Sequence, residues 1–174
     1  TVGEKVVDMT GLVGQYAHGN EPSHHIAYLY SYAGAPYKTQ ERVRYLLDNL
    51  YGNTPNDGVS GNEDCGQMSA WYVISALGFY AVDPAGGNYV FGTPLFDRAE
   101  IEISEGRKLV VEAQRQSPDD KYVQSVKLNG KAYDKAWFPH SAVANGGKIV
   151  FRMGAQPNPK FASGPDAAPP SMTK

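Results

Sequence analysis

Two polar segments of this sequence contain side chains that can catalyse hydrolysis or bind a cation. The segment "GNEDCG", residues 61–66, places two carboxylates directly before an apolar stretch. The segment "HGNEPSHH", residues 18–25, sets an asparagine and a glutamate among three histidines. Carboxylates and histidines are common general bases, and carboxylate and amide oxygens are the ligands that calcium prefers. These two segments are therefore the candidate sites for chemistry.

The acidic pair has a structural and a catalytic interpretation. Asp64, followed three residues later by Gln67, fits a capping box at the start of a helix, and Glu63 would then complement the helix dipole. Alternatively, Asp64 acts as general base on a water molecule, while Gly61 and Gly66 let the backbone come close to a ligand. A capping carboxylate is held rigidly and keeps its second oxygen free, so the two roles are compatible.

The histidine-rich segment favours a hard cation over zinc. His24 and His25 are adjacent, so on a helix they point about 100° apart and cannot share one zinc ion. Asn20 and Glu21 offer oxygen ligands, which suit calcium. The alternative is an ordinary polar loop in which the histidines form local hydrogen bonds.

Composition restricts the class of protein. A chain of 174 residues with 41% hydrophobic residues and a net charge of -2 is long enough to fold as one globular domain, or as a domain with an appendage. The near-neutral charge provides no basic surface for nucleic acid, and no apolar run approaches the roughly 20 residues of a membrane span. The single cysteine, Cys65, excludes an internal disulfide. The twelve tyrosines of the chain suit either stacking on sugar rings or packing in an ordinary core.

Hydrophobic periodicity divides the chain into three parts. The first part, residues 1–92, contains helices expected over about 23–34, 39–52 and 66–80, the last of them apolar nearly all round. The second part, residues 93–156, alternates apolar and polar side chains like an antiparallel sheet, with a tight hairpin turn at Asn129-Gly130. The Pro-, Ala- and Ser-rich tail, residues 157–174, is expected to be disordered.

These elements predict an α+β fold that does not enclose itself well. A helix that is apolar all round needs more neighbours than three helices and a few strands supply. Either the helices form a small bundle on the sheet, or the chain is one end of a longer protein. The apolar third helix favours the longer protein.

The chain resembles the C-terminal part of glycoside hydrolase family 92, the calcium-dependent exo-acting α-mannosidases. The resemblance is carried by "GQYAHGNEPSHHIAYLYSYAG", "KTQERVRYLLDNLY", "GNEDCGQMSAWYVISALGFYAVDP" and "YVFGTPLFDRAEI", and it extends over about residues 10–160. It implies a β-sandwich followed by an (α/α)6 toroid. The present chain would supply the last toroid helices and the antiparallel strands that follow them, which accounts for the unshielded helix.

The resemblance also implies a function, namely inverting hydrolysis of terminal α-mannosyl residues of glycans with calcium as cofactor and a preference for α-1,2 linkages. The general-acid glutamate of the family lies upstream of the matched part, so this chain alone is expected to be inactive without the missing N-terminal part of the enzyme. The family further implies a secreted or periplasmic location. The alternative is a non-catalytic carbohydrate-binding or assembly module.

Individual residues are assigned by their match to the family motifs. Asp64 matches the general base, and Glu63 is its alternative in the catalytic role. The candidates in the other segment are His18, Glu21 and His25 for substrate binding and Asn20 and Glu21 for calcium.

Overall fold

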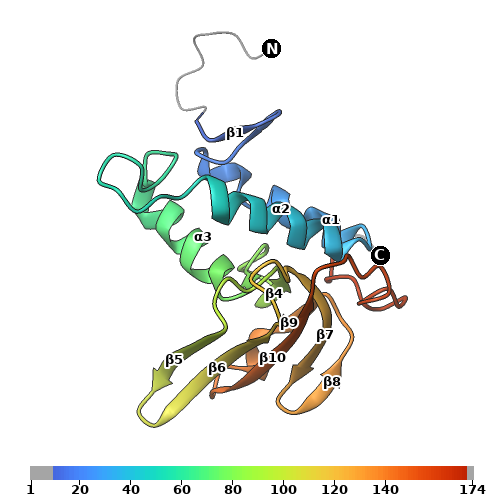
Figure 1. Cartoon of the computed structure of the whole chain (residues 1–174). Helices are drawn as coiled ribbons and strands as arrows, with labels where there is room; N and C mark the ends of the chain where they lie inside the picture. The colour runs from blue at the N-terminus through green and yellow to red at the C-terminus, as the bar shows by residue number, and fades with distance from the viewer. Residues whose placement is uncertain (1–9, 172–174) are drawn as a thin grey trace.

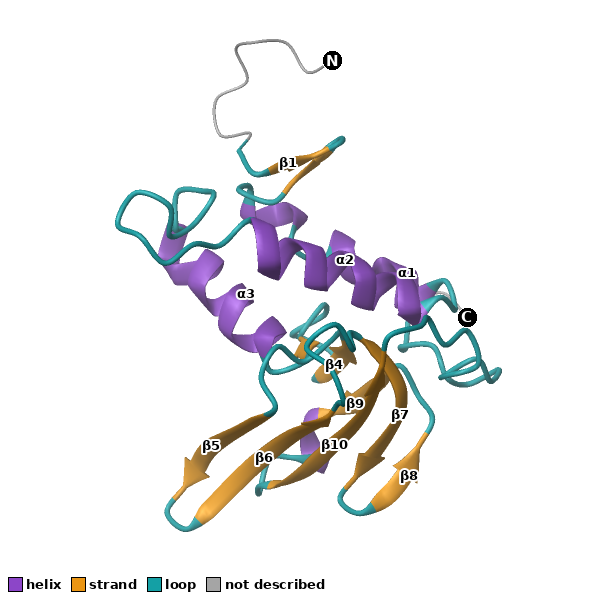
Figure 2. Cartoon of the chain, in the orientation of Figure 1, coloured by secondary structure: helices purple, strands orange, loops and turns teal. Residues whose placement is uncertain are grey.

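The computed structural model describes residues 10–171, which form a layer of helices packed against two small β-sheets (Figures 1 and 2). In chain order, the helical elements are the 3₁₀ helices Glu21–Ser23 and Ile26–Tyr28, α1 (Leu29–Tyr32), α2 (Pro36–Asn49), the 3₁₀ helix Asp64–Gly66, α3 (Gln67–Ala76) and the 3₁₀ helix His140–Ala142. A two-stranded hairpin of β1 (Leu12–Val13) and β2 (Tyr16–Ala17) precedes them. None of these helices is long and apolar enough to cross a membrane.

Helix α2 is the longest helix of the described residues, and one of its faces is buried. Val43, Leu46 and Leu47 are almost completely buried. The helix begins three residues earlier than predicted, because Pro36 occupies its first turn, where a missing N–H costs nothing. Thr39, the predicted start, lies inside the helix and is buried.

The segment predicted as one helix over 23–34 is broken into short helical turns. Ser23 does not cap a helix, because its hydroxyl donates instead to the carbonyls of Ala17 and Asn20. These bonds bend the chain back towards the β1–β2 hairpin, so a continuous helix cannot form there. Gly34 ends the segment as predicted, with φ at +73°.

Helix α3 is shorter than predicted, and it is incompletely enclosed, as the sequence pattern indicated. It ends at Ala76, because Gly78 has a φ of +96° and the next two residues form β3 (Phe79–Tyr80). One face of the helix, which includes Trp71, is buried, whereas Val73 on another face is 57% exposed. Within residues 10–171, this helix therefore presents apolar surface to solvent.

The larger sheet has the strand order β5-β6-β10-β7-β8. Its strands are β5 (Arg98–Ser104), β6 (Arg107–Gln114), β7 (Tyr122–Leu128), β8 (Lys131–Tyr133) and β10 (Gly147–Gly154). The expected antiparallel pairing is confirmed for every pair except β10 with β6, which is parallel. Because β6 and β7 run in opposite directions, a strand inserted between them must be parallel to one of the two.

The hairpin between β7 and β8 confirms the turn predicted at Asn129-Gly130. Both residues have positive φ, +50° and +80°, and Leu128 pairs with Lys131 across the turn. Positive φ at both central residues is the property of the two-residue turn that matches strand twist.

A smaller sheet with the order β3-β4-β9 lies between the helices and the large sheet (Figure 1). Its other two strands are β4 (Asn88–Phe91) and β9 (Trp137–Pro139). A buried side-chain contact also links the two layers, since the Val123 N–H of β7 donates to Gln40 Oε1 of α2 at 3.0 Å.

The prediction of a disordered tail is wrong for residues 157–171. Phe161, Ala162 and Ala167 are buried in the core of the large sheet, and the Ala136 N–H donates to the Ala167 carbonyl at 2.8 Å. The composition of the tail did not reveal this packing, because a few apolar residues among prolines are enough to cover an open sheet face. Two segments lie outside the described residues: residues 1–9 of the predicted first part and residues 172–174 of the predicted tail.

Candidate active site

The acidic turn before α3 has an unusual backbone conformation. Glu63 and Cys65 have φ values of +59° and +53°, and Gly66 has +75°. Non-glycine residues rarely adopt this left-handed region, and such residues concentrate at functional sites. The turn therefore exists because surrounding contacts hold it.

One of those contacts overturns the predicted capping box. The Glu63 carboxylate accepts from both the backbone N–H of Ser69, at 3.1 Å, and the Ser69 hydroxyl, at 2.5 Å. Glu63 thus satisfies a free N–H at the start of α3, the role predicted for Asp64. Gln67 does not reach back to Asp64, because its side chain donates to His24 Nδ1 and to the Tyr80 hydroxyl.

Asp64 is left exposed next to this tightly held neighbour. Within residues 10–171, no hydrogen bond or ion pair restrains its carboxylate, whereas its backbone N–H donates to Glu21 Oε1 at 3.2 Å. The backbone of Asp64 is therefore fixed while its side chain remains available.

The same bond brings the two candidate segments together. Glu21 belongs to the histidine-rich segment and Asp64 to the acidic turn, 43 residues later. Two glycines permit the close approach: a Cβ atom on Gly61 would lie 2.4 Å from the Gly19 carbonyl oxygen. The sequence pattern presented these segments separately, and the fold joins them into one polar surface.

His18 lies under this surface rather than on it. Its side chain is completely buried, with Nδ1 2.7 Å from the Tyr16 hydroxyl and Nε2 2.7 Å from the Tyr51 hydroxyl. Burial, together with the smaller effect of the neighbouring His24, lowers the pKa of His18 to about 3. A ligand contact by the His18 ring, as predicted, would require one of the two tyrosines to move.

His24, which the motif match did not assign to the site, connects the histidine-rich segment to α3. Its Nε2 donates to the His18 carbonyl at 2.9 Å, so Nδ1 is free to accept from Gln67 Nε2 at 3.1 Å. The Trp71 indole N–H donates to the His24 carbonyl, and burial lowers the pKa of His24. Spacing alone could not reveal this role, because it depends on which face of α3 meets the loop.

The remaining candidate residues lie on the solvent-accessible side of the histidine-rich segment, residues 18–25. Asn20 and Glu21 are half-buried, and His25 is exposed. Within residues 10–171, no three His, Cys, Asp or Glu side chains cluster closely enough to hold a metal ion. Asn20 and Glu21 nevertheless provide oxygen donors of the type that calcium takes, and such an ion accepts further oxygens from backbone, water or ligand.

Comparison with known proteins identifies the class of this chain. The model of the glycosyl hydrolase family 92 catalytic domain matches residues 2–155. A family GH92 alpha-mannosidase from Bacteroides thetaiotaomicron, solved in complex with mannoimidazole, superposes with a TM-score of 0.90 at 44% identity, over 95% of this chain and 22% of that one. The chain is thus part of a glycoside hydrolase catalytic region. It belongs to glycosyl hydrolase family 92.

Two further relatives support this assignment. A GH92 inverting mannosidase from the same organism has a TM-score of 0.84 at 41% identity, over 92% of this chain and 22% of that one. An uncharacterized secreted glycosidase from Arthroderma benhamiae is 30% identical over 158 residues, which are 88% of this chain and 20% of the relative. The chain therefore spans about a fifth of the length of these relatives.

Proposed function

We propose that this chain supplies part of the active site of a calcium-dependent, inverting exo-α-mannosidase that removes terminal α-mannosyl residues, preferably α-1,2-linked, from glycans. The observation that carries the proposal is the hydrogen bond from the Asp64 backbone N–H to the Glu21 carboxylate, which joins the turn that carries the unrestrained Asp64 side chain to the histidine-rich segment. Membership of family 92 and the similarity to two mannosidases support the substrate class.

In this proposal Asp64 is the general base. Its carboxylate removes a proton from the attacking water molecule, and its backbone bond to Glu21 holds the turn that carries it. An inverting hydrolase needs a second carboxyl group about 6.5–9.5 Å away to protonate the leaving oxygen. We assign that general acid to the part of the enzyme outside this chain, so the chain alone is proposed to be inactive.

Glu63 is the weaker candidate for the base. Both of its carboxylate oxygens are engaged by Ser69, and removing a proton from water would compete with these bonds. Its proposed role is to hold the left-handed turn so that Asp64 projects outward.

Calcium would be held by the side-chain oxygens of Asn20 and Glu21. When bound, the ion would supply positive charge for sugar hydroxyl groups. Glu21 and the exposed His25 are proposed to contact the substrate. The buried His18 would act indirectly by supporting the loop that carries them. The similarity to a relative called secreted supports a secreted enzyme, with periplasmic export as the other possibility.

The experiment compares this chain with the complete product of its gene in a mannose-release assay. The substrate is α-1,2-mannobiose, and each protein is tested with calcium and with a chelator. We expect release by the complete product, loss of release with the chelator, and no release by this chain. Release by this chain would place the general acid within it, and release that persists in chelator would remove calcium from the proposal.

A second candidate is a non-catalytic carbohydrate-binding or assembly module. It is favoured by one fact, namely that the chain covers about a fifth of the catalytic relatives. Titration calorimetry of this chain with mannobiose, with and without calcium, separates the two. Heat of binding by this chain, together with a complete gene product that has no hydrolytic activity, would favour the module.

A further inference from the structure

A pocket at the junction of the helical layer and the large sheet brings two arginines together. Arg44 lines it from α2, and Arg115 lines it from the segment that follows β6 (Figure 1). The pocket has a volume of about 360 Å³, within the range of roughly 300–1,000 Å³ that small-molecule sites occupy. Its other lining residues are Leu95, Asp97, Gln116, Ser117 and Pro118. All of them lie outside the acidic turn and the histidine-rich segment.

Both guanidinium groups have buried N–H groups that lack an acceptor. Within residues 10–171, Arg44 Nη1 is buried and has no hydrogen-bond partner, while Asp48 holds the Nε of the same side chain at 2.8 Å. Arg115 Nε lies 2.9 Å from Asp97 Oδ1, but this ion pair lacks the geometry of a hydrogen bond. Buried donors are nearly always paired in folded proteins, so an acceptor is expected in this pocket.

The lining of the pocket has an excess of positive charge. Two guanidinium groups face one carboxylate, that of Asp97, whose side chain is 80% exposed. The Arg115 side chain is only 9% exposed, and its Nη2 donates to the carbonyls of Pro94 and Phe96, so it is held in place. Burial lowers the pKa of the Arg115 guanidinium, Asp97 opposes this effect, and the nearby positive charge of Arg44 lowers the pKa further. A negatively charged ligand would relieve this repulsion.

A second carboxylate near Arg115 is already engaged by the backbone. Asp120 is buried, and its Oδ2 accepts from the N–H groups of Gln116 and Ser117 at 2.8 and 3.2 Å. These bonds shape the segment that forms one wall of the pocket. Asp120 therefore supports the wall and leaves the space between the two arginines open to a ligand.

We propose that this pocket binds a tetrahedral oxyanion, phosphate or sulfate, between Arg44 and Arg115. A guanidinium presents its N–H donors in a planar fork that matches two oxygens of such an ion, and it does so better than a lysine ammonium. A water molecule could accept from the same donors, but it would leave the two positive charges uncompensated. The same recognition applies to a free ion and to a phosphoryl or sulfate group on a larger molecule, and the experiment separates these two sources.

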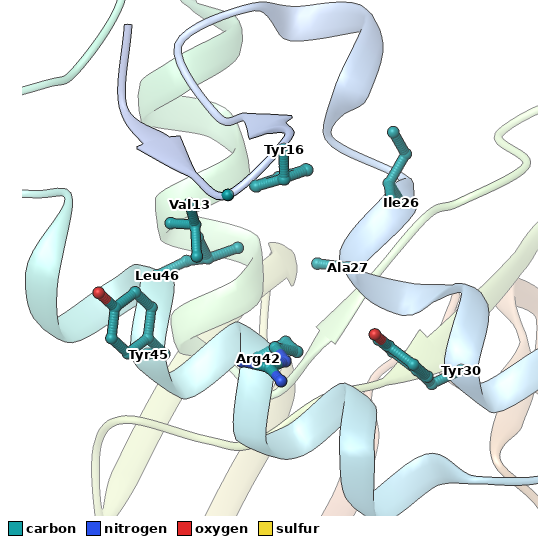
Figure 3. A pocket seen from close by; sticks show the side chains of 9 residues that line it. Val13, Tyr16, Ile26, Ala27, Tyr30, Arg42, Tyr45 and Leu46 are labelled. Carbon is teal, nitrogen blue, oxygen red and sulfur yellow. The ribbon is translucent and has the colours of Figure 1, made fainter. Parts of the chain in front are cut away.

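Titration calorimetry of the complete gene product with inorganic phosphate tests the proposal without any enzymatic turnover. The buffer is free of calcium, and its ionic strength is held constant with chloride. The site variants are Arg44→Met and Arg115→Met, which remove the charge and keep most of the side-chain length. The control is Arg42→Met on the same helix, because Arg42 lines a separate apolar groove together with Val13 and Tyr45 (Figure 3).

We expect saturable binding of phosphate at one site in the unmodified protein. Each of the two site variants should weaken binding at least about tenfold, because each removes charge-assisted hydrogen bonds, while Arg42→Met should bind as the unmodified protein does. Asp97→Asn should tighten binding, because it removes the carboxylate that competes for Arg115. Its control is Glu105→Gln, at the exposed turn between β5 and β6, which should have no effect.

Titration with glucose 6-phosphate distinguishes the two sources of the oxyanion. Binding tighter than that of inorganic phosphate would identify a phosphorylated larger molecule as the ligand, and weaker binding would identify the free ion. Both results require that Arg44→Met weakens the binding.

Two results would overturn the proposal. One is the absence of saturable phosphate binding by the complete gene product. The other is unchanged binding in Arg44→Met, which would locate the phosphate elsewhere. Circular dichroism checks that each variant folds, and if the more deeply buried Arg115→Met does not fold, Arg44→Met and Asp97→Asn still decide the question. Because no turnover is measured, the result is independent of the proposed mannosidase activity.

Discussion

Two parts of this molecule are stabilised in different ways. The helical half contains α1 to α3, and the sheet half contains strands β3 to β10. Among residues 10–171, six of the eight buried polar side chains lie in the helical half, namely His18, His24, Ser31, Thr39, Gln40 and Ser75. The core of the sheet half consists of apolar side chains centred on residues such as Phe91, Phe138 and Phe151. The sheet half closes over its own core, whereas the helical half combines directional hydrogen bonds inside with exposed apolar groups outside.

This difference explains where the candidate site lies. Hydrophobic burial is non-directional, so it stabilises a sheet without fixing a single side chain to within a hydrogen-bond length. The network through His18, His24 and Gln67 has donors and acceptors that pair in one arrangement, which holds the Glu21 and Asp64 segments together. Such a network is sensitive to pH and to mutation, and these properties can be measured.

The largest expected effect concerns catalysis and is confined to the helical half. In the complete gene product, Asp64→Asn should lower kcat on an α-mannoside by about 10²–10⁴-fold, because the amide cannot accept the proton of water. Its backbone contact to Glu21 would remain, so the thermal transition should not move. The control is Asp119→Asn, an exposed carboxylate of the sheet half. Near-normal turnover of the Asp64 variant would remove it from the catalytic role.

Removing a buried aromatic ring tests how separate the two cores are. Trp71→Ala in the helical core and Phe151→Ala in the sheet core should each lower the free energy of unfolding by about 3–5 kcal/mol. The Gln40–Val123 hydrogen bond joins the two layers, so urea unfolding of this chain should show one transition in both variants. Val73→Ala, at a 57% exposed position of α3, is the control for Trp71. Two separate transitions would mean that the halves unfold independently.

The buried histidines should make the helical half sensitive to acid. The pKa of His18 is about 3 in the folded chain, against about 6.5 when unfolded, so the unfolded chain binds more protons between these values. Stability should therefore fall as pH drops from 6.5 towards 3, by up to about 1.4 kcal/mol per pH unit for this residue. His18→Gln should flatten that dependence in urea titrations, and His25→Gln, which removes an exposed histidine, is the control. An unchanged slope in His18→Gln would show that another group titrates.

The smallest expected effect concerns the backbone of the sheet half. Gly130 has a φ of +80° with no atom near the position of an added Cβ, so Gly130→Ala should cost about 1–2 kcal/mol through backbone conformation alone. Gly58→Ala, in the helical half, is the matched control, because its φ is not in the left-handed region and the nearest contact would be 3.9 Å away. Thermal unfolding of both variants gives the comparison. Equal losses would attribute the effect to something other than the left-handed turn.

Local sequence patterns predicted which helices, strands and turns form better than they predicted where these elements begin and end. The buried face of α2 and the Asn129-Gly130 turn follow from periodicity and from conformational preference, which act over a few residues. The break in the 23–34 segment did not follow, because it depends on hydrogen bonds from Ser23 back to Ala17 and Asn20. The parallel β6–β10 pair was missed for a related reason, since strand order is a property of the whole sheet.

For the candidate site, the sequence specifies the available chemistry: which carboxylates, histidines and amide oxygens are present, and the family whose motifs they match. Their arrangement in space follows from the fold. It gave the capping role to Glu63, left Asp64 free, placed His18 in the interior and revealed His24 as a connector. The physical reason is that His18, His24 and Asp64 make contacts with residues 33 to 43 positions away, and no local pattern specifies which of two adjacent side chains faces inward.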